Sequence, residues 1–107
     1  MKACLIIHDK ETDELGHTVE IRMWHVPVTK HAPHGYKYSL VYIVGGQRII
    51  GYDNERGKGD HRHCEGNEIA YEFRGLKQLA EDFRRDIAAY REKHHAGEEG
   101  KNRDKGH

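Results

Sequence analysis

The chain has 107 residues, enough for one domain, and its 18 basic and 18 acidic residues cancel. This balance excludes a bulk field that would draw the protein to nucleic acid or to a membrane, so any anion must be bound locally. The 2 cysteines exclude a disulfide framework and a four-cysteine zinc site, and no stretch matches a signal peptide or a membrane span, so we expect a cytoplasmic protein with no membrane contact.

The first two predicted strands cover residues 3–8 and 18–26. The first is a short apolar run rich in β-branched residues, and it includes Cys4, which we expect to be buried and inert. In the second, apolar and polar side chains alternate, as is typical of a strand with one buried face. A polar turn joins the two strands.

The next two predicted strands, residues 36–44 and 47–52, flank Gly45 and Gly46. Two glycines between β-rich runs favour a two-residue type I′ turn, which needs positive φ at both positions. The register that follows from this turn gives the pairs Val44–Gln47, Tyr42–Ile49, Leu40–Gly51 and Tyr38–Asp53. It predicts that the face packed on the helix is the one formed by Val41, Ile43, Ile50 and Tyr52.

After a polar loop at residues 57–66, the sequence predicts a fifth strand at residues 68–73 and one helix from Leu76 to about Lys93. Gly75 stands at the expected helix cap, where serine or aspartate would be stronger. The helix carries a single apolar stripe with three- and four-residue spacing, formed by Leu76, Leu79, Phe83, Ile87 and Tyr90.

These elements predict an α+β fold, with a five-stranded, mainly antiparallel sheet and one C-terminal helix packed on one of its faces. Residues 1–93 form the single expected domain. Residues 94–107 are polar, with one alanine as their only apolar residue, and we expect them to be a disordered tail. A tyrosine-rich or aliphatic sheet face could also support a homodimer.

One polar run, residues 52–63, carries the side-chain types needed for acid–base work on a phosphate. His61 and His63 are two positions apart, which puts both on one side of an extended chain. The run also supplies carboxylates, cations and backbone freedom. These come from Asp53, Glu55 and Asp60, from Arg56, Lys58 and Arg62, and from Gly57 and Gly59.

This combination could cleave RNA without a metal or any other cofactor. The ribose 2′-hydroxyl is a built-in nucleophile, so the catalyst needs a base, an acid and a cation for the developing charge. We assign the acid and the base to His61 and His63, the cation to Lys58, and the orientation of a histidine to Asp53. Substrate contacts are assigned to Arg56 and Arg62, to an anion nest at Gly57 and Gly59, and to base stacking on Tyr38.

Several alternatives remain open at this stage. His61 and His63 could bind zinc with Asp53, Asp60 or Cys64 as a third ligand, giving a metal-dependent hydrolase. The run could equally belong to a non-enzymatic module that binds RNA or a protein and blocks its target. It could also be a plain solvated loop, and a tyrosine-rich strand more often serves cross-strand packing than base stacking.

The chain resembles the TumE family of small bacterial toxin–antitoxin proteins over about residues 2 to 90. The resemblance rests on residues 38–42, on the run 51–63, and on residues 71–73 with Leu79, Asp82, Phe83 and Asp86. It implies the toxin of a type II toxin–antitoxin system, paired with a helix-turn-helix antitoxin encoded by the adjacent gene. Asp53, Lys58, His61 and His63 match the family's pattern, whereas Gly75 departs from it. The ribonuclease assignment comes from the residues rather than from the family.

Overall fold

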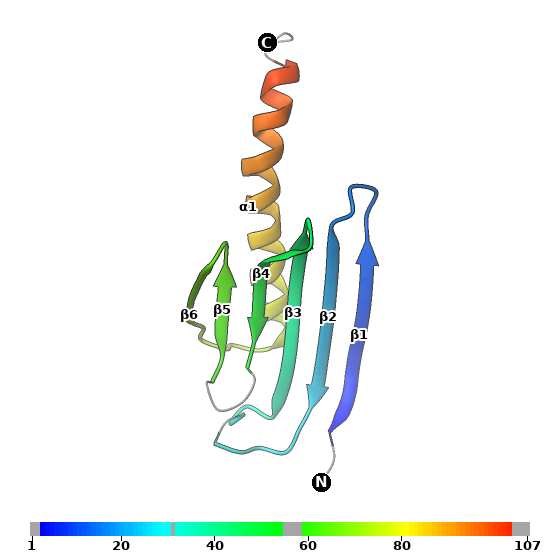
Figure 1. The fold of residues 1–107 in the computed structure, drawn as a ribbon. Coiled ribbons are helices and arrows are strands. Elements are labelled where there is room, and N and C mark those ends of the chain that lie inside the picture. Colours follow the sequence, from blue (N-terminus) through cyan, green and yellow to red (C-terminus); the bar gives the residue numbers. More distant parts are fainter. Residues whose placement is uncertain (1–2, 31, 55–58, 104–107) are drawn as a thin grey trace.

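The computed structural model describes the backbone of residues 3–30, 32–54 and 59–103, and side chains as far as residue 94. It contains one antiparallel sheet of 6 strands in sequence order, with a single helix behind it (Figure 1). The α+β class is confirmed, but the sheet has six strands where five were predicted. The elements are β1 (Cys4–Thr12), β2 (Thr18–His25), β3 (Tyr36–Val44), β4 (Gln47–Asp53), β5 (His61–Cys64), β6 (Asn67–Ala70) and α1 (Leu76–Arg103).

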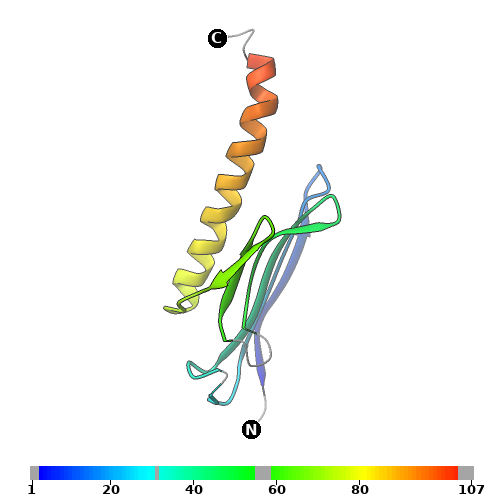
Figure 2. The same cartoon turned by 60° about the vertical axis from the view of Figure 1, so that its left-hand side comes forward.

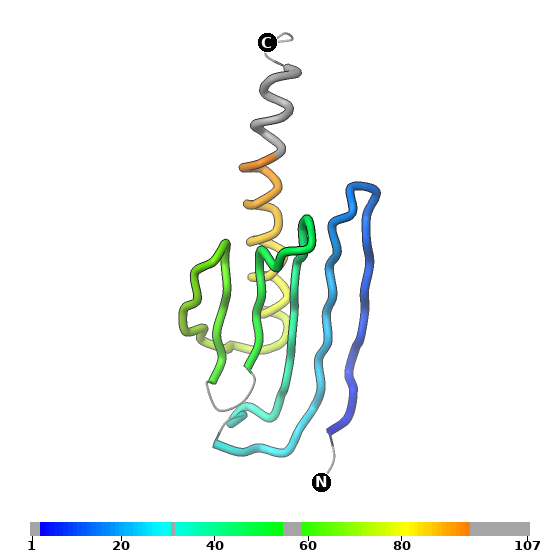
Figure 3. The backbone as a smooth tube through the Cα atoms, viewed as in Figure 1, coloured from blue at the N-terminus to red at the C-terminus, as the bar shows by residue number. Residues whose placement is uncertain are grey.

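The additional strand is β5, which lies within the predicted polar loop. Its sequence His-Arg-His-Cys has no apolar alternation, so side-chain pattern could not reveal it. Backbone pairing to β4 on one side and β6 on the other creates the strand. A tight turn at Glu65 and Gly66, both with positive φ, joins β5 to β6. Figure 3 follows the chain through these successive hairpins.

A β-bulge corrects the predicted register of the β3–β4 hairpin. The turn at Gly45 and Gly46 has positive φ at both positions and pairs Val44 with Gln47, as predicted. The register then shifts between Tyr42 and Ile43, and the later pairs are Tyr42–Ile50, Val41–Gly51, Leu40–Tyr52 and Ser39–Asp53. An extra residue in one strand turns all later side chains to the other face. The helix therefore packs on Tyr38, Leu40, Tyr42, Ile50 and Tyr52, so the predicted face was right for Ile50 and Tyr52 of β4 and wrong for Val41 and Ile43 of β3.

Helix α1 crosses one face of the sheet, called here the helix face, and leaves the opposite, open face uncovered (Figures 1 and 2). The predicted stripe is confirmed, because Leu79, Phe83 and Ile87 are buried against the sheet. The helix continues to Arg103, beyond its expected end near Lys93. The domain bound at residue 93 and the disordered tail stay predictions. No helix within the described residues is both long and apolar enough to cross a membrane.

Helix α1 does not cover the edge strand β1, and all residues of β1 are exposed. The prediction that Cys4 is buried was therefore wrong. The apolar run of β1 suggested a core strand, but α1 packs over the middle of the sheet, and Leu5, Ile6 and Ile7 stay 58%, 47% and 41% exposed. The sheet thus keeps an unprotected apolar edge, a feature that commonly marks an interaction surface.

Two buried carboxylates tie α1 to the rest of the domain. Asp82 accepts hydrogen bonds from Tyr71 Oη at 2.5 Å and from Gln78 Nε2 at 2.8 Å. Asp86 accepts from the Tyr52 hydroxyl and from Arg62 Nε, the latter at 2.7 Å. Buried polar groups are stabilising only when they have such partners, so these bonds fix where the helix sits.

Acid is expected to weaken the fold through Asp82. Burial acts to raise the pKa of this carboxyl, but the bonds from Tyr71 and Gln78 and the charges of Arg85 and Arg74 outweigh burial and lower the pKa below 3.8. A carboxyl whose pKa is lower in the native protein than in the unfolded chain stabilises the fold at pH values above its unfolded pKa. This stabilisation is lost as the pH falls through the native pKa.

The variant Asp82→Asn should lose about 1–2 kcal/mol of unfolding free energy at pH 7, and its stability should fall less steeply below pH about 4. Urea unfolding at a series of pH values, with the exposed neighbour Glu81→Gln as control, measures both effects. Parallel pH curves for Asp82→Asn and the parent chain would contradict the assignment.

Candidate active site on the open face

Strands β4 and β5 together place three candidate residues on the open face. Asp53 lies directly opposite His61 in the antiparallel register, and Gly51 lies opposite His63. Directly opposed residues point to the same side of a sheet, and side chains alternate along each strand. Since Tyr52 belongs to the helix face, its neighbours Gly51 and Asp53 must face the other way.

The three side chains meet in one cluster, joined by Glu68 from β6. Asp53 Oδ1 lies 2.7 Å from His61 Nε2, and the two imidazole ring centroids are 5.3 Å apart. Glu68 Oε2 lies 3.2 Å from His61 Nε2 and 3.5 Å from His63 Nε2. We refer to Asp53, His61, His63 and Glu68 as the open-face cluster.

Arg48 adds a positive charge beside this cluster. A Cβ atom added to Gly51 would lie 3.0 Å from Arg48 Cδ, so the arginine side chain runs across the bare glycine backbone. Its Nη1 comes within 3.9 Å of Asp53 Oδ2. A glycine at residue 51 therefore lets a guanidinium approach the histidine pair from the open face.

Both ring nitrogens of His61 face hydrogen-bond acceptors. Nδ1 lies 3.1 Å from the carbonyl oxygen of Gly59, and Nε2 faces the carboxylates of Asp53 and Glu68. A carbonyl can only accept, so Nδ1 carries a proton and donates it. The nitrogen that faces the carboxylates then needs either a second proton, which makes the ring an imidazolium, or a bound cation.

His63 is set up differently from its neighbour. Burial is the main influence that lowers its pKa below the usual value, and the positive charge of Arg48 lowers it further. The neutral ring, with one nitrogen free to accept a proton, is therefore favoured at neutral pH. Its side chain is 19% exposed, against 10% for His61, so a ligand on the open face can reach it more easily.

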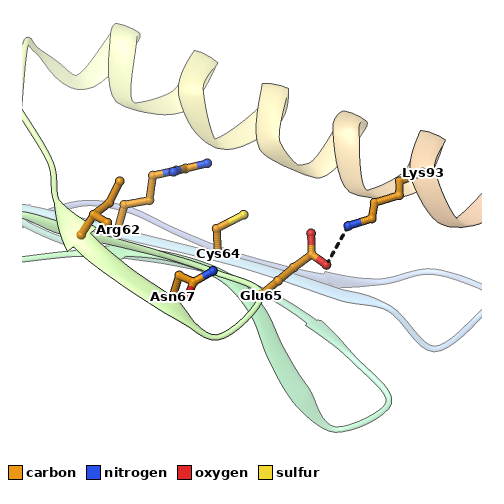
Figure 4. Close-up of a pocket in the computed structure, with 6 residues that line it drawn as sticks. Arg62, Cys64, Glu65, Asn67 and Lys93 are labelled. Atoms are coloured by element: carbon orange, nitrogen blue, oxygen red, sulfur yellow. Dashed lines mark hydrogen bonds and ion pairs between the residues drawn. The ribbon is translucent and has the colours of Figure 1, made fainter.

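The structure separates two candidate residues from the cluster. Tyr38 is fully buried on the helix face. Arg62, between the two histidines in sequence, points to the helix face, where it donates to Asp86 and to the Tyr52 hydroxyl. Figure 4 shows Arg62 and Cys64 pointing from the sheet toward α1, where they line a cavity with Glu65, Asn67, Ile69 and Lys93.

Among the other candidates, Arg56, Gly57 and Lys58 lie outside the described residues. Gly59 has a φ of 76° and provides the carbonyl that holds His61. Glu68 and Arg48 were missed by sequence reasoning. The signal for Glu68 is its position opposite His63 on β6, which becomes visible only when β5 is known to be a strand.

Asp60, offered above as a third metal ligand, is engaged elsewhere. Its Oδ2 accepts hydrogen bonds from Tyr38 Oη at 2.5 Å and from His34 Nε2 at 2.9 Å. The tautomer of His34 is fixed, because its Nδ1 accepts the backbone N–H of Tyr36. At the other end of the β4–β5 connection, buried Asn54 accepts the backbone N–H of Tyr38. Asn54 and Asp60, at the two ends of the β4–β5 connection, are thus both hydrogen-bonded to β3 or to the loop before it.

The cluster also has the composition of a cation site. Asp53, His61 and His63 each offer one ligand atom, and these atoms all lie within 4.8 Å of one another. Metal-bound histidines usually donate their second ring N–H to a carbonyl or a carboxylate, as His61 does to Gly59. Two imidazoles and a carboxylate suit zinc and similar ions. The arrangement is thus chemically suited either to proton transfer or to metal binding.

Comparison with known proteins gives one family. A family model described as Toxin TumE matches residues 5–91, which cover all of the sheet except Cys4 of β1, together with the part of α1 that packs on the sheet. The searches of curated proteins and of solved structures returned no match.

Proposed function

Because the chain belongs to the TumE toxin family, we propose that it is the toxin of a type II toxin–antitoxin system and that it cleaves RNA at the open-face cluster. A toxin of this kind implies an antitoxin, and we propose that the adjacent gene encodes it as a helix-turn-helix protein. The observation that supports cleavage is the convergence of His61, His63 and Asp53 on one exposed face.

The proposed reaction needs no metal. His63 accepts the proton of a ribose 2′-hydroxyl, whose oxygen attacks the adjacent phosphorus. The bond from phosphorus to the 5′-oxygen breaks, and His61, held as an imidazolium, gives its proton to that oxygen. The products are a 2′,3′-cyclic phosphate and a free 5′-hydroxyl. The lowered pKa of His63 and the two acceptors around His61 support this division of roles.

Charge and orientation come from the neighbours of the histidines. Asp53 holds the ring of His61 through the 2.7 Å contact. Arg48 is placed to stabilise negative charge that develops on the phosphate, and we propose the same role for Lys58. Arg56 and a backbone nest at Gly57 and Gly59 remain proposed phosphate contacts. Tyr38 and Arg62 are not included among the substrate contacts, because they belong to the helix face.

A metal-dependent hydrolase is the second candidate, favoured by the ligand atoms of Asp53, His61 and His63 within 4.8 Å of one another. A divalent ion there would activate a water molecule to attack the phosphodiester. This route predicts different products, because attack by water leaves no cyclic phosphate. It also predicts that chelation abolishes the activity.

The two routes can be separated with untagged protein and a structured RNA. Under the leading proposal, cleavage continues in excess EDTA and yields cyclic phosphate and 5′-hydroxyl ends. A kinase labels the new 5′ end of the downstream fragment directly if that end is a free hydroxyl. If the end is a phosphate, the fragment is labelled only after phosphatase treatment. Cleavage that stops with EDTA and returns with Zn²⁺ or Mn²⁺ would establish the second candidate instead. RNA that is bound but never shortened, with or without metal, would leave only the non-enzymatic binding module.

A further inference from the structure

The helix face has a second feature that the proposed chemistry does not use. Beside α1 lies a groove of about 320 Å³, with Val19 and Ile21 of β2 as its floor. Phe83, Ile87 and Ala88 of α1 form its wall. We call it the α1–β2 groove. Its floor and wall are almost entirely apolar, whereas the open face carries the charged cluster.

The groove exists because one helix is too narrow for this sheet. A helix with its side chains is about 10 Å wide, and neighbouring strands are about 4.8 Å apart, so one helix covers roughly two or three strands. Here α1 shares its buried core with β3, with β4 and with Met23 of β2. The helix face of β1 is left without cover and that of β2 is only partly covered, since Met23 is 6% exposed whereas Ile7, opposite it on β1, is 41% exposed. A second helix beside α1 would fit this space.

The two sides of the groove carry opposite charges. On the α1 side, Arg84 and Arg91 lie two turns apart along the rim. On the β1 side, Asp9 lies opposite Ile21, and Glu11 lies opposite Val19, so both acids share the helix face with the groove floor.

The arginines differ in how far they are engaged within the domain. Arg91 is partly satisfied, because it reaches Asp13 at 3.7 Å and the Tyr42 hydroxyl at 3.3 Å. Arg84 has no ion pair with any residue in the described part of the chain. An acidic partner residue facing α1 would therefore gain a new contact.

We infer that the α1–β2 groove is the docking site for an amphipathic helix of the antitoxin. The chemistry of the groove specifies that helix: an apolar stripe for the floor, acidic residues on the flank toward Arg84 and Arg91, and basic residues on the flank toward Asp9 and Glu11. The inference rests on the toxin assignment, and it is independent of whether the open-face cluster cleaves RNA.

A second copy of this chain fits the groove less well. The only helix in the described residues is α1, and its apolar stripe is already buried on its own sheet at Leu79, Phe83 and Ile87. It has no second apolar stripe to offer a neighbouring groove. The partner must therefore supply a helix that the toxin lacks, and in a toxin–antitoxin pair the antitoxin is the molecule that does so.

Adjacent alanines on α1 provide a matched pair of variants. Ala88 lines the groove, whereas Ala89 is exposed and does not line it. Both substitutions to arginine add the same side chain to an exposed helix position, and both should fold. Binding is measured by calorimetry between the full toxin chain and the protein encoded by the adjacent reading frame. The toxin chain carries His63→Ala so that RNA cleavage is slowed and does not limit growth or yield.

We expect Ala88→Arg to weaken binding at least 10-fold and Ala89→Arg to change it less than 2-fold. Arg84→Glu should also weaken binding, and the loss should shrink as salt is raised. Equal affinities for the two alanine variants would overturn the inference, because the adjacent protein would then bind elsewhere on the toxin. A toxin dimer in sedimentation that Ala88→Arg alone disrupts would also overturn it, because the occupant would then be a second copy. If the toxin without a groove substitution does not bind the adjacent protein at all, the proposed antitoxin fails and the inference fails with it. None of these outcomes decides whether the open-face cluster cleaves RNA, because cleavage is measured in a separate experiment.

Discussion

Replacing His63 with alanine is expected to slow RNA cleavage by about 10²- to 10⁴-fold, the contribution typical of a general acid or base. Neutral His63 lies on the open face, where a ribose hydroxyl can reach it, and no other described imidazole except His61 shares its cluster. His61→Ala should give a loss of similar size. The double variant should be little worse than either single one, because residues that act as a unit are strongly non-additive. Single-turnover rates with excess protein measure the chemical step directly.

His8→Ala provides the control for this series. His8 is also on the sheet and also contacts a carboxylate, with its Nε2 2.9 Å from Glu20 Oε2, but it stands far from β5 on the edge strand. Its loss should leave the rate within about 2-fold of the parent if proton transfer is confined to the cluster.

Induced expression gives the cellular counterpart of this test. The parent chain and His8→Ala should arrest growth, and the double variant of His61 and His63 should not. Full toxicity of the double variant, together with an unchanged cleavage rate, would place the active site elsewhere. Because His61 is buried, its variant is compared only after circular dichroism has shown that it folds. If the His61 variant does not fold, the single variant His63→Ala is used for the test.

The geometry of the histidine pair could be anticipated from sequence, whereas its partners could not. Two histidines two positions apart share one side of any extended segment, and β5 confirms that relation for His61 and His63. Glu68 reaches them only through the β5–β6 hairpin, whose first strand has a polar sequence without alternation. Nothing local to β5 identifies it as a strand, since it is formed by hydrogen bonding to its neighbours.

The register of the central hairpin shows a second limit. The glycine turn correctly predicts its first pair, but the bulge beyond it changes which residues of β3 share a face with Ile50 and Tyr52. This change has an energetic reason. It brings Tyr38, Leu40 and Tyr42 to the face of Ile50 and Tyr52, and all five side chains are fully buried there. A rule based on turn length sees only the local geometry and has no access to this gain in burial.

Arg62 illustrates how residue type can mislead within a candidate site. Its position between two histidines suggested phosphate binding, but alternation along β5 sends it to the helix face. As a charged residue on the predicted helix, Asp86 was expected on its solvent-facing side, and this was wrong, because Asp86 is 7% exposed. The contact between Arg62 and Asp86 could be predicted only from the folded structure, because the two residues are 24 positions apart in the chain.

Replacing Asp86 with alanine is expected to cost about 3 kcal/mol of unfolding free energy, a large part of the 5–15 kcal/mol typical of a small domain. Asp86 is 7% exposed and accepts bonds from Arg62 Nε and from the buried Tyr52 hydroxyl. Removing it leaves a guanidinium and a hydroxyl without their acceptor, and an uncompensated buried charge costs more than the lost bond. Urea unfolding followed by circular dichroism gives the difference.

Lys93→Ala is the matched control, because Lys93 Nζ also bridges α1 to the β5–β6 hairpin, at 3.4 Å from Glu65 Oε1 (Figure 4). Its side chain is 63% exposed, so the loss should stay below about 1 kcal/mol. The double variant Arg62→Leu with Asp86→Leu should recover much of the stability lost in Asp86→Ala, since apolar residues of similar size often replace a buried ion pair at little cost.

Recovery in the double variant would show that the loss comes from the orphaned charge rather than from a misplaced helix. If Asp86→Ala and Lys93→Ala prove equally mild, the contacts of Asp86 do not hold α1, and the helix is held by its apolar stripe and by Asp82. The Arg62–Asp86 pair would then not be what fixes the wall of the α1–β2 groove relative to its floor.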